Sequence, residues 1–137
     1  MTYMEAHRHL MKYSIRPSVQ RTAVMEYLMN NRTHPTVDDI FNALINSIPT
    51  LSKTTVYNTL NLFVSKGAVQ VLNIDERNAR YDVDVSNHAH GYCRSCNKVF
   101  DIFDINDEQF RIPNAKGLRI DTVEISYFGV CDICTSN

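Results

Sequence analysis

The sequence has no long hydrophobic run, no strong excess of charge of either sign, and no internal repeat or low-complexity segment. No window approaches the roughly 18 apolar residues that a membrane-spanning helix needs. The N-terminus also lacks the apolar stretch of a secretory signal peptide. With 44% hydrophobic and 21% charged residues, the composition is typical of a folded chain and not of a disordered one. We therefore expect a cytoplasmic protein without a membrane partner.

The net charge of −1 argues neither for nor against a nucleic-acid partner. The distribution of charge is more informative. Residues 1–66 hold seven Lys/Arg against four Asp/Glu, whereas residues 67–137 hold seven against eleven. A basic first half on an acidic remainder is compatible with a DNA-binding region joined to a different domain.

Cysteine is scarce, and all four cysteines lie in the last third of the chain, as two Cys-x-x-Cys pairs: Cys93 with Cys96, and Cys131 with Cys134. Two independent reduced pairs or a dithiol switch are the alternatives to a metal site. In a reducing compartment, paired motifs of this kind more often bind zinc than form disulfides. We predict that all four bind one structural Zn²⁺, which would add stability that a small domain lacks.

Apolar residues at helical spacing predict four helices, over residues 3–13, 19–30, 37–48 and 53–66. The expected N-caps of the last three are Ser18, Thr36 and Ser52, with Asp39 closing a capping box and Gly67 ending the last helix. The buried face of the second helix is expected to include Val19, Val24, Tyr27 and Leu28.

After Gly67 the apolar period changes from 3.6 residues to 2. Residues 68–74 and 79–85 then read as two strands of a β-hairpin. Helices followed by a hairpin is the winged-helix order, in which the helix before the hairpin enters the major groove of DNA. Further on, residues 90–92, 98–103 and 120–128 are predicted as strands, and residues 107–110 as one or two helical turns.

The predicted fold class is therefore α+β. A winged-helix DNA-binding domain is expected over residues 1–85. A small α/β domain stabilised by the Cys₄ zinc site is expected over residues 86–137.

Polar residues around the start of the helix over residues 53–66 could contact base edges and phosphates, and basic residues nearby could neutralise phosphates. An ordinary solvated surface is the alternative for both sets, and the sequence alone does not decide between them. The candidate DNA contacts are Arg16, Arg21, Lys53, Thr54, Thr55, Tyr57 and Asn58.

A second metal site is indicated by His88 and His90, which share one face of a strand because they are two residues apart. Imidazoles mixed with carboxylates suit Fe²⁺, Mn²⁺ or Zn²⁺. Spacing alone does not require that His34, Asp82 or Asp101 bind the same metal. His34 could be a solvated loop residue, and Asp82 and Asp101 could merely pair with Arg80 and Lys98.

Taken together, these motifs closely resemble the ferric uptake regulator (Fur) family over nearly the whole chain. The resemblance rests on His34-Pro-Thr-Val-Asp-Asp-Ile, Ser52-Lys-Thr-Thr-Val-Tyr-Asn-Thr-Leu, Arg80-Tyr-Asp82, His88-Ala-His90-x-x-Cys-x-x-Cys and Tyr-Phe-Gly-Val-Cys131-x-x-Cys134. It implies a homodimeric bacterial repressor that binds a palindromic operator in double-stranded DNA. It also implies a dimerisation role for the zinc domain and a regulatory Fe²⁺ or Mn²⁺ site formed by His34, Asp82, His88, His90 and Asp101.

Within this family, three features are similar to the peroxide-sensing members. Asp101 stands where iron sensors usually have glutamate, Asn87-His88-Ala89-His90 stands where they usually read HHDH, and Asn58 stands where they often have arginine. The resemblance then implies control of oxidative-stress genes through iron-catalysed oxidation of the histidines at positions 34 and 88. An iron-, manganese- or zinc-homeostasis repressor of the same family is the alternative.

Two functions from other classes are weaker. A small metalloenzyme would need an open metal position and a general base, a role that only Asp82 or Glu124 could fill. Nothing in the sequence suggests a substrate pocket, and the winged-helix order would be unexplained, so we expect that the protein is not an enzyme. A zinc-stabilised protein-interaction module would show no DNA preference in a gel-shift experiment.

Overall fold

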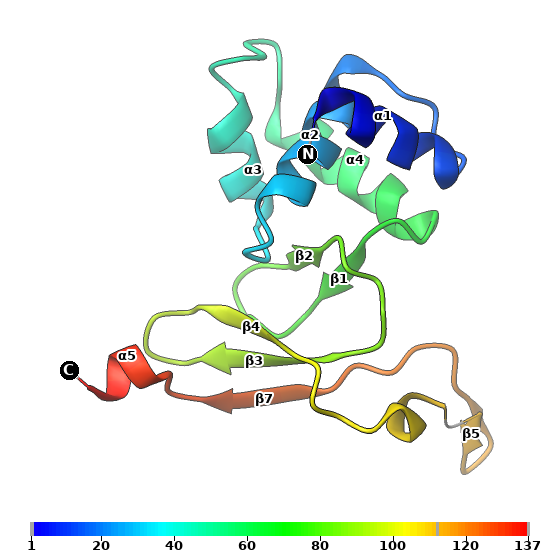
Figure 1. Cartoon of the computed structure of the whole chain (residues 1–137), viewed down its shortest axis with the longest axis vertical. Helices are drawn as coiled ribbons and strands as arrows, with labels where there is room; N and C mark the ends of the chain where they lie inside the picture. Colours follow the sequence, from blue (N-terminus) through cyan, green and yellow to red (C-terminus); the bar gives the residue numbers. More distant parts are fainter. Residues whose placement is uncertain (1, 112, 137) are drawn as a thin grey trace. The chain divides into compact units, whose positions relative to one another are not determined.

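The structure is a computed structural model, and residues 2–111 and 113–136 are described. The chain divides into two compact units, which we call unit 1 (residues 1–85) and unit 2 (residues 86–137). Figure 1 traces the chain through the elements of both units. No helix among the described residues is long and apolar enough to cross a membrane.

Unit 1 contains four helices, each of which begins at a polar N-cap. They are α1 (Tyr3–Lys12), α2 (Val19–Asn30), α3 (Val37–Leu44) and α4 (Lys53–Ser65). The predicted caps of the last three are confirmed. The Ser18 and Ser52 hydroxyls each accept a backbone N–H three residues on, at 3.1 Å. Thr36 and Asp39 form the expected capping box.

The predicted helix over residues 37–48 is shorter in the structure, because α3 ends at Leu44. The residues that follow continue as a tighter turn. The backbone N–H groups of Ser47 and Ile48 both donate to the Leu44 carbonyl, at 3.1 and 2.9 Å. Sharing one carbonyl in this way satisfies the helix end before Pro49, which cannot continue a helix.

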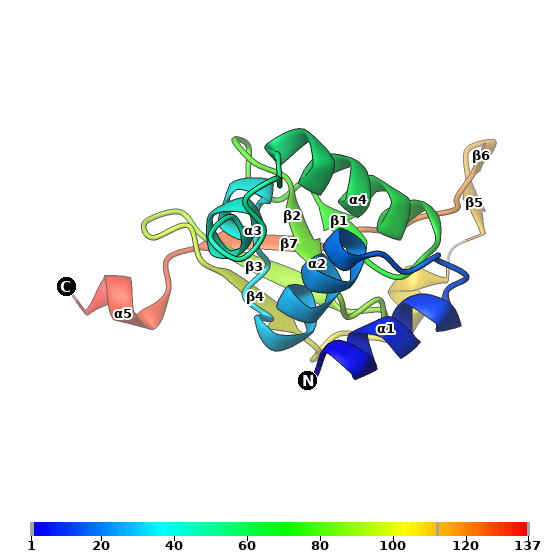
Figure 2. The same ribbon diagram turned by 90° about the horizontal axis from the view of Figure 1, so that it is seen from above.

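An apolar core joins the helices of unit 1. Val56, Leu60 and Phe63 form a fully buried stripe along α4, and α1 and α2 lie side by side (Figure 2). The expectation that Val19 belongs to this core is wrong, since its side chain is 64% exposed. Val19 is the first residue of α2 and lies off the face that carries the buried Val24.

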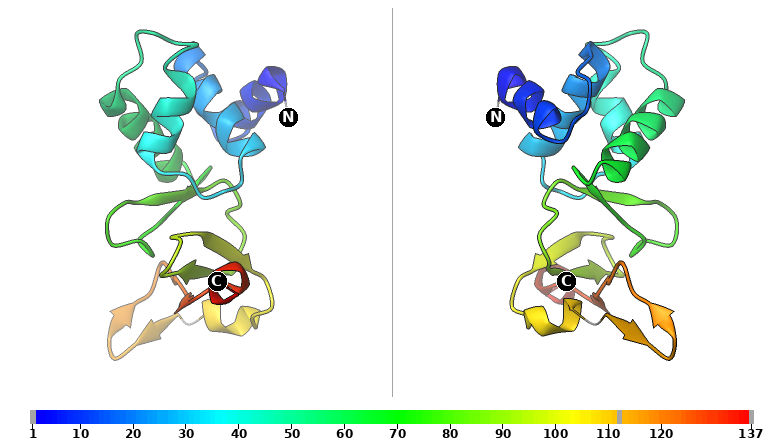
Figure 3. Two further views of the ribbon diagram at one scale, coloured as in Figure 1. Left: turned by 90° about the vertical axis from the view of Figure 1, so that its left-hand side faces the viewer. Right: turned by 90° about the vertical axis from the view of Figure 1, so that its right-hand side faces the viewer.

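After Gly67, which has φ +79°, the chain forms an antiparallel hairpin of β1 (Gln70–Leu72) and β2 (Arg80–Asp82) (Figure 3). The pairing places Val71 opposite Tyr81. These strands are shorter than the predicted ranges, because contacts of Asp75 organise the connection as an irregular turn. Four helices followed by this hairpin give unit 1 the predicted winged-helix order.

Unit 2 is built on a three-stranded sheet in the order β4-β3-β7 (Figure 1). The central strand β3 (Ala89–Cys93) runs antiparallel to β4 (Val99–Ile102) and parallel to β7 (Ser126–Gly129). The predicted strand over residues 120–128 is therefore confirmed only at its end. The pairing of β3 with β7 runs from His90 opposite Ser126 to Cys93 opposite Gly129. Residues 120–125 precede this paired segment and form no strand.

The remaining elements of unit 2 are small. The 3₁₀ helix η1 (Asp107–Phe110) occupies the predicted helical turns. A short hairpin of β5 (Asn114–Ala115) and β6 (Leu118–Arg119) follows (Figure 3). Helix α5 (Asp132–Thr135) ends the described chain.

Candidate metal centres and nucleic-acid interface

The parallel pairing of β3 and β7 brings the two cysteine pairs together. Cys93 ends β3 opposite Gly129 of β7, and Cys131 follows two residues later. A tight turn after Cys93 is closed by the Asn97 N–H, which donates to the Cys93 carbonyl at 2.8 Å. Cys131 is also the N-cap residue of α5, which carries Cys134. Sequence-distant pairs thus meet at one end of the sheet.

The sulfur geometry fits a zinc ion. All four Sγ atoms of the cysteines lie within 4.8 Å of one another, and those of Cys96 and Cys131 are 3.9 Å apart. A tetrahedral site with Zn–S bonds of about 2.3 Å has S···S edges of about 3.8 Å. The arrangement is therefore close to a closed Cys₄ tetrahedron.

Hydrogen bonds prepare one of these sulfurs to be a thiolate. The backbone N–H groups of Cys131 and Cys96 donate to Cys93 Sγ at 3.3 and 3.5 Å. They lower the pKa of the Cys93 thiol to about 6 despite its burial. For Cys134, the Ser95 side chain favours the thiolate, but the Cys131 sulfur and burial outweigh it and raise the pKa to about 12. A bound cation would favour the thiolate form of each cysteine and so offset the effect that neighbouring sulfurs have on the pKa of Cys134.

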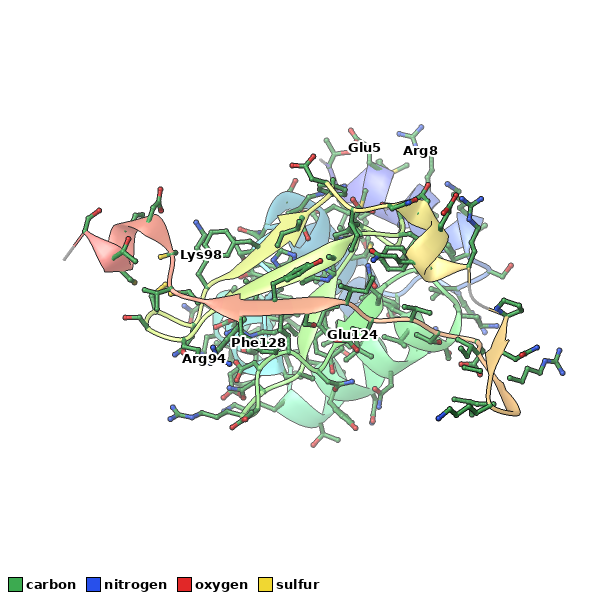
Figure 4. The ribbon with its side chains drawn as sticks, turned by 90° about the horizontal axis from the view of Figure 1, so that it is seen from below. Glu5, Arg8, Arg94, Lys98, Glu124 and Phe128 are labelled. Atoms are coloured by element: carbon green, nitrogen blue, oxygen red, sulfur yellow. The ribbon has the colours of Figure 1, made fainter. Side chains whose placement is uncertain are left out.

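Arg94 fastens the cysteine turn to β7. Its backbone N–H donates to the Gly129 carbonyl at 2.8 Å. Its guanidinium lies over the Phe128 ring, 5.1 Å from the ring centroid (Figure 4). This second contact between the β3 end and β7 holds the first cysteine pair beside the second.

A cluster of imidazoles around a carboxylate lies at the other end of β3. The Nε2 atoms of His88 and His90 are 2.9 and 3.3 Å from Asp101 Oδ1, and β4 presents Asp101 directly opposite His90. Both histidines are buried. The Ser86 carbonyl, 2.8 Å from His88 Nδ1, orients the His88 ring, and Phe103 stacks on it at 4.7 Å between centroids.

Unit 1 holds a buried histidine–aspartate pair of its own. His34 Nε2 lies 3.4 Å from Asp82 Oδ2, and each side chain is only 3% exposed. His34 is therefore not the solvated loop residue that its sequence position allowed. Buried imidazoles facing carboxylates suit Fe²⁺, Mn²⁺ or Zn²⁺. Unit 1 thus offers two candidate ligands and unit 2 offers three.

The sequence left open whether Asp82 only pairs with Arg80, so the partners of Arg80 bear on the role of Asp82. The Arg80 guanidinium pairs with Asp75, at 3.0 Å from Nη2 to Oδ2. Burial raises the pKa of the Asp75 carboxyl, but the Arg77 N–H and the Arg80 guanidinium outweigh burial and hold that pKa below its usual value. Asp75 is therefore ionised at neutral pH.

The candidate DNA contacts fall into two groups. Arg16, Arg21, Thr55 and Asn58 line one groove between the start of α2 and α4. Thr54 and Tyr57 are exposed on α4 beside them. Ser18 and Gln20 also line this groove. They were not among the predicted DNA contacts, although their place at the start of a capped helix could have drawn attention to them.

Lys53 differs from the other candidates. Its Nζ atom is 3.2 Å from Asp38 Oδ1 and 5.6 Å from the centroid of the Phe41 ring. Both charged side chains are more than half exposed. An exposed pair of this kind is weak, so it leaves Lys53 able to exchange Asp38 for a phosphate.

Comparisons with known proteins place the chain in one family. The model of the ferric uptake regulator family matches residues 12–128. The peroxide operon regulator of Bacillus subtilis is 33% identical over 96% of this chain and 92% of its own length. The peroxide-responsive repressor PerR of Staphylococcus epidermidis is 31% identical over 91% of this chain and 85% of its own.

Solved structures show the same fold. The ferric uptake regulator of Helicobacter pylori, described with three functional metal-binding sites, has a TM-score of 0.76 at 21% identity and covers 100% of this chain and 96% of its own. PerR from Streptococcus pyogenes, a structure described for peroxide sensing and gene regulation, has a TM-score of 0.53 at 28% identity over 96% of this chain and 92% of its own. Since the family model spans most of the sequence and a relative above 30% identity spans nearly all of it, the chain belongs to the ferric uptake regulator family of metal-dependent regulators.

Proposed function

We propose that this protein is a homodimeric, metal-dependent transcriptional repressor that leaves its operator when hydrogen peroxide oxidises its metal-binding histidines. The observation that carries the proposal is that Asp101 faces both His88 and His90 within unit 2, and that all three residues of this cluster carry groups suited to a metal. The buried pair of His34 and Asp82 in unit 1 supports it. Relatives above 30% identity that carry peroxide-responsive names support it.

In this proposal, one Fe²⁺ or Mn²⁺ ion takes ligands from both units: His34, Asp82, His88, His90 and Asp101. Two ligands in unit 1 are too few to hold such an ion firmly, and the three in unit 2 leave positions open. A shared ion would bind most tightly when both sets face it together. It would thereby favour one arrangement of the two units, which is how metal binding would control DNA binding.

The choice of peroxide over metal level rests on the carboxylate at position 101. Aspartate is one methylene shorter than glutamate, so its reach toward a shared ion differs. When bound, a ferrous ion supplies the reducing electrons that cleave peroxide. The Nε2 atoms of His88 and His90 both face Asp101 Oδ1, so an ion held there would have imidazole carbon beside it.

What the histidines then do is lose affinity. Peroxide would supply the oxygen atom: its O–O bond breaks, one oxygen inserts into a ring C–H bond and the other leaves as water, and the ring returns the electrons that the ion lent to peroxide. The 2-oxo ring that results has lost its aromatic nitrogen donor, so it is a poorer ligand. We assign this oxidation to His34 and His88. Oxidation of His34 would cut unit 1 from the ion, and DNA binding would be lost. The four cysteines, gathered for zinc, would take no part in sensing.

DNA recognition is assigned to the domain of residues 1–85, with α4 in the major groove and the groove arginines on phosphates. The domain of residues 86–137 would form the dimer. A two-fold dimer demands a palindromic operator. Tyr57 and Asn58, both exposed on α4, would lie near base edges. Asn58→Arg should therefore change operator preference, and unchanged preference with intact binding would argue against base readout at this position.

Footprinting on a candidate operator tests the proposal. The zinc-loaded protein is supplied with Fe²⁺, Mn²⁺ or additional Zn²⁺, each with and without peroxide. We expect protection with Fe²⁺ and Mn²⁺, and loss of protection by peroxide only with Fe²⁺. Protection that follows metal concentration but ignores peroxide would instead support an iron-, manganese- or zinc-homeostasis repressor.

A further inference from the structure

The loop that carries His34 has an unusual backbone. His34 has φ +57°, in the left-handed region that residues with a side chain seldom adopt. Proline follows it, which further restricts its conformation. A residue in this region persists only when its surroundings fix it. The contacts that fix it therefore matter for where the imidazole points.

Two hydrogen bonds from strand β2 reach the backbone of this loop. The Tyr81 N–H donates to the Pro35 carbonyl at 3.1 Å. The Arg80 guanidinium donates through Nη1 to the His34 carbonyl at 3.3 Å. Residues alternate along a strand, so Arg80 and Asp82 share one face of β2 while Tyr81 packs into the apolar core on the other. The face that presents the Asp82 carboxylate to the His34 imidazole thus also presents a cation to the His34 carbonyl.

Arg80 is itself held in place. Its Nε and Nη2 atoms both donate to Asp75 Oδ2, at 3.1 and 3.0 Å. The other oxygen of Asp75 accepts the Arg77 N–H at 2.9 Å. The side chains of Arg80 and Asp75 are only 12% and 6% exposed. A planar guanidinium fixed at two nitrogens can direct its third toward the loop, which a lysine ammonium could not do in the same way.

We propose that Arg80, anchored by Asp75, is a positioning residue that holds the His34 backbone in its left-handed conformation and so aims the His34 imidazole at the regulatory metal. The effect on metal binding rests on the proposed function, whereas the effect on the backbone of His34 does not. Asp75 lies in the turn between β1 and β2, so the ion pair of Arg80 and Asp75 connects this turn to the loop that carries His34.

The first test is the affinity of the zinc-loaded protein for Mn²⁺, which reacts poorly with peroxide. Arg80→Lys keeps the positive charge but removes the planar guanidinium with its several donor nitrogens. We expect it to weaken Mn²⁺ binding about ten-fold, as for other partners that orient metal ligands. Arg77→Lys, an equal change at an exposed arginine of the same turn, is the matched control and should have no effect.

A double-mutant cycle separates positioning from general damage. When His34→Ala has already removed the imidazole, Arg80→Lys should cost less than about two-fold more, because residues that act through one another are not additive. An undiminished ten-fold cost in the His34→Ala background, or no cost in the native background, would overturn the proposal. If His34→Ala alone leaves Mn²⁺ affinity unchanged, it is the proposed metal site that fails.

The second test needs no regulatory metal. The HN–Hα coupling and the Cα chemical shift of His34, measured by NMR on zinc-loaded, manganese-free protein, report its backbone conformation. We expect the left-handed values in the native protein and in Arg77→Lys, and their loss in Arg80→Lys and in Asp75→Asn. Asp75→Asn preserves the shape of the buried side chain and serves if Arg80→Lys does not fold. Unaltered His34 values in a folded variant would refute the positioning role.

Discussion

The two units of the chain are stabilised by different means. Unit 1 buries a continuous apolar cluster, to which all four helices and the hairpin contribute. In unit 2, the apolar residues buried among the described positions are only Ala89, Cys93 and Val99. Both units expose some large apolar side chains, but those of unit 2 stand against far fewer buried ones: Phe103, Leu118, Tyr127, Phe128, Val130 and Ile133.

This contrast explains why the cysteines are where they are. A unit of about 50 residues with so small a core needs a metal or a partner subunit. The Cys₄ cluster lies wholly within unit 2 and is suited to hold the first, while the exposed apolar surface suits the second. Unit 1 needs neither, so its histidine and aspartate ligands are not required for its own fold. The comparison thus separates the candidate site for a structural metal from the candidate site for the proposed signalling metal.

The largest expected effect is loss of the zinc site. Cys96→Ser should release zinc, break the dimer and unfold unit 2, because structural zinc contributes on the order of 10 kcal/mol in small zinc domains. The helical circular dichroism of unit 1 should persist. Zinc content and molecular mass in solution measure the outcome.

His90→Ala is the control for this change, since it removes a candidate ligand of the other metal from β3, the strand that leads into the cysteine turn. It should retain zinc and the dimer. A folded, dimeric, zinc-free Cys96→Ser protein would show that unit 2 does not depend on zinc.

The next effect concerns the signalling metal alone. His34→Ala should lower Mn²⁺ affinity by about 100-fold or more, since even residues that only orient ligands cost 10–100-fold. Zinc content should not change, because the cysteines belong to unit 2. Operator binding should weaken even without peroxide. Titration with Mn²⁺ and a gel-shift experiment provide the measurements.

His7→Ala, on α1, removes a histidine of unit 1 that has no role in the proposal. It should behave as the native protein. Full metal-dependent operator binding by His34→Ala would remove His34 from the signalling site.

A smaller effect is expected from Asp101→Glu, which retains a carboxylate. Metal-dependent operator binding should stay within about three-fold of the native value, a change of less than 1 kcal/mol. The peroxide concentration needed for release should rise about ten-fold, roughly 1.4 kcal/mol in the oxidation barrier. Operator binding of iron-loaded protein across a peroxide titration measures both.

Asp104→Glu makes the same change at an exposed carboxylate three residues away and should leave both values alone. Loss of metal-dependent binding in Asp101→Glu would mean that position 101 decides whether metal binds at all, and not how the site responds to peroxide.

The smallest effect probes the core of unit 1. Thr22 is fully buried in α2, and its hydroxyl has no hydrogen-bond partner among the described residues. Thr22→Val should raise the free energy of unfolding of unit 1 by about 1 kcal/mol, because it removes a buried polar group without a partner. Urea unfolding followed by circular dichroism measures this.

The same change at the exposed Thr33 is the control and should be close to neutral. Zinc content and Mn²⁺ affinity should stay constant in both variants. Destabilisation by Thr22→Val would show that the hydroxyl is satisfied in solution.

Local signals in the sequence were sufficient for much of the fold. Ser18, Thr36, Ser52 and Gly67 act through hydrogen bonds or φ values within a few residues, so their roles could be predicted. The exposure of Val19 and the lack of a strand over residues 120–125 could not, because they depend on which face packs and on how far β3 extends as a pairing partner.

The candidate sites divide in the same way. The Cys-x-x-Cys pairs and the spacing of His88 and His90 are local patterns, and the cysteines are indeed gathered as a tetrahedral site requires. The burial of His34 and the Arg80 contact to its carbonyl depend on a loop meeting a strand some 46 residues later. No short-range pattern announces such a contact.

Mass spectrometry of iron-loaded protein, paired with operator binding across a peroxide titration, tests the central claim most directly. We predict that release from DNA will rise in step with addition of one oxygen atom to the peptides that contain His34 or His88. Manganese-loaded protein should stay bound and unmodified, with all four cysteines still on zinc. If iron-loaded protein stays on its operator and both histidines remain unmodified, the division between a holding metal and a peroxide-sensing metal is wrong.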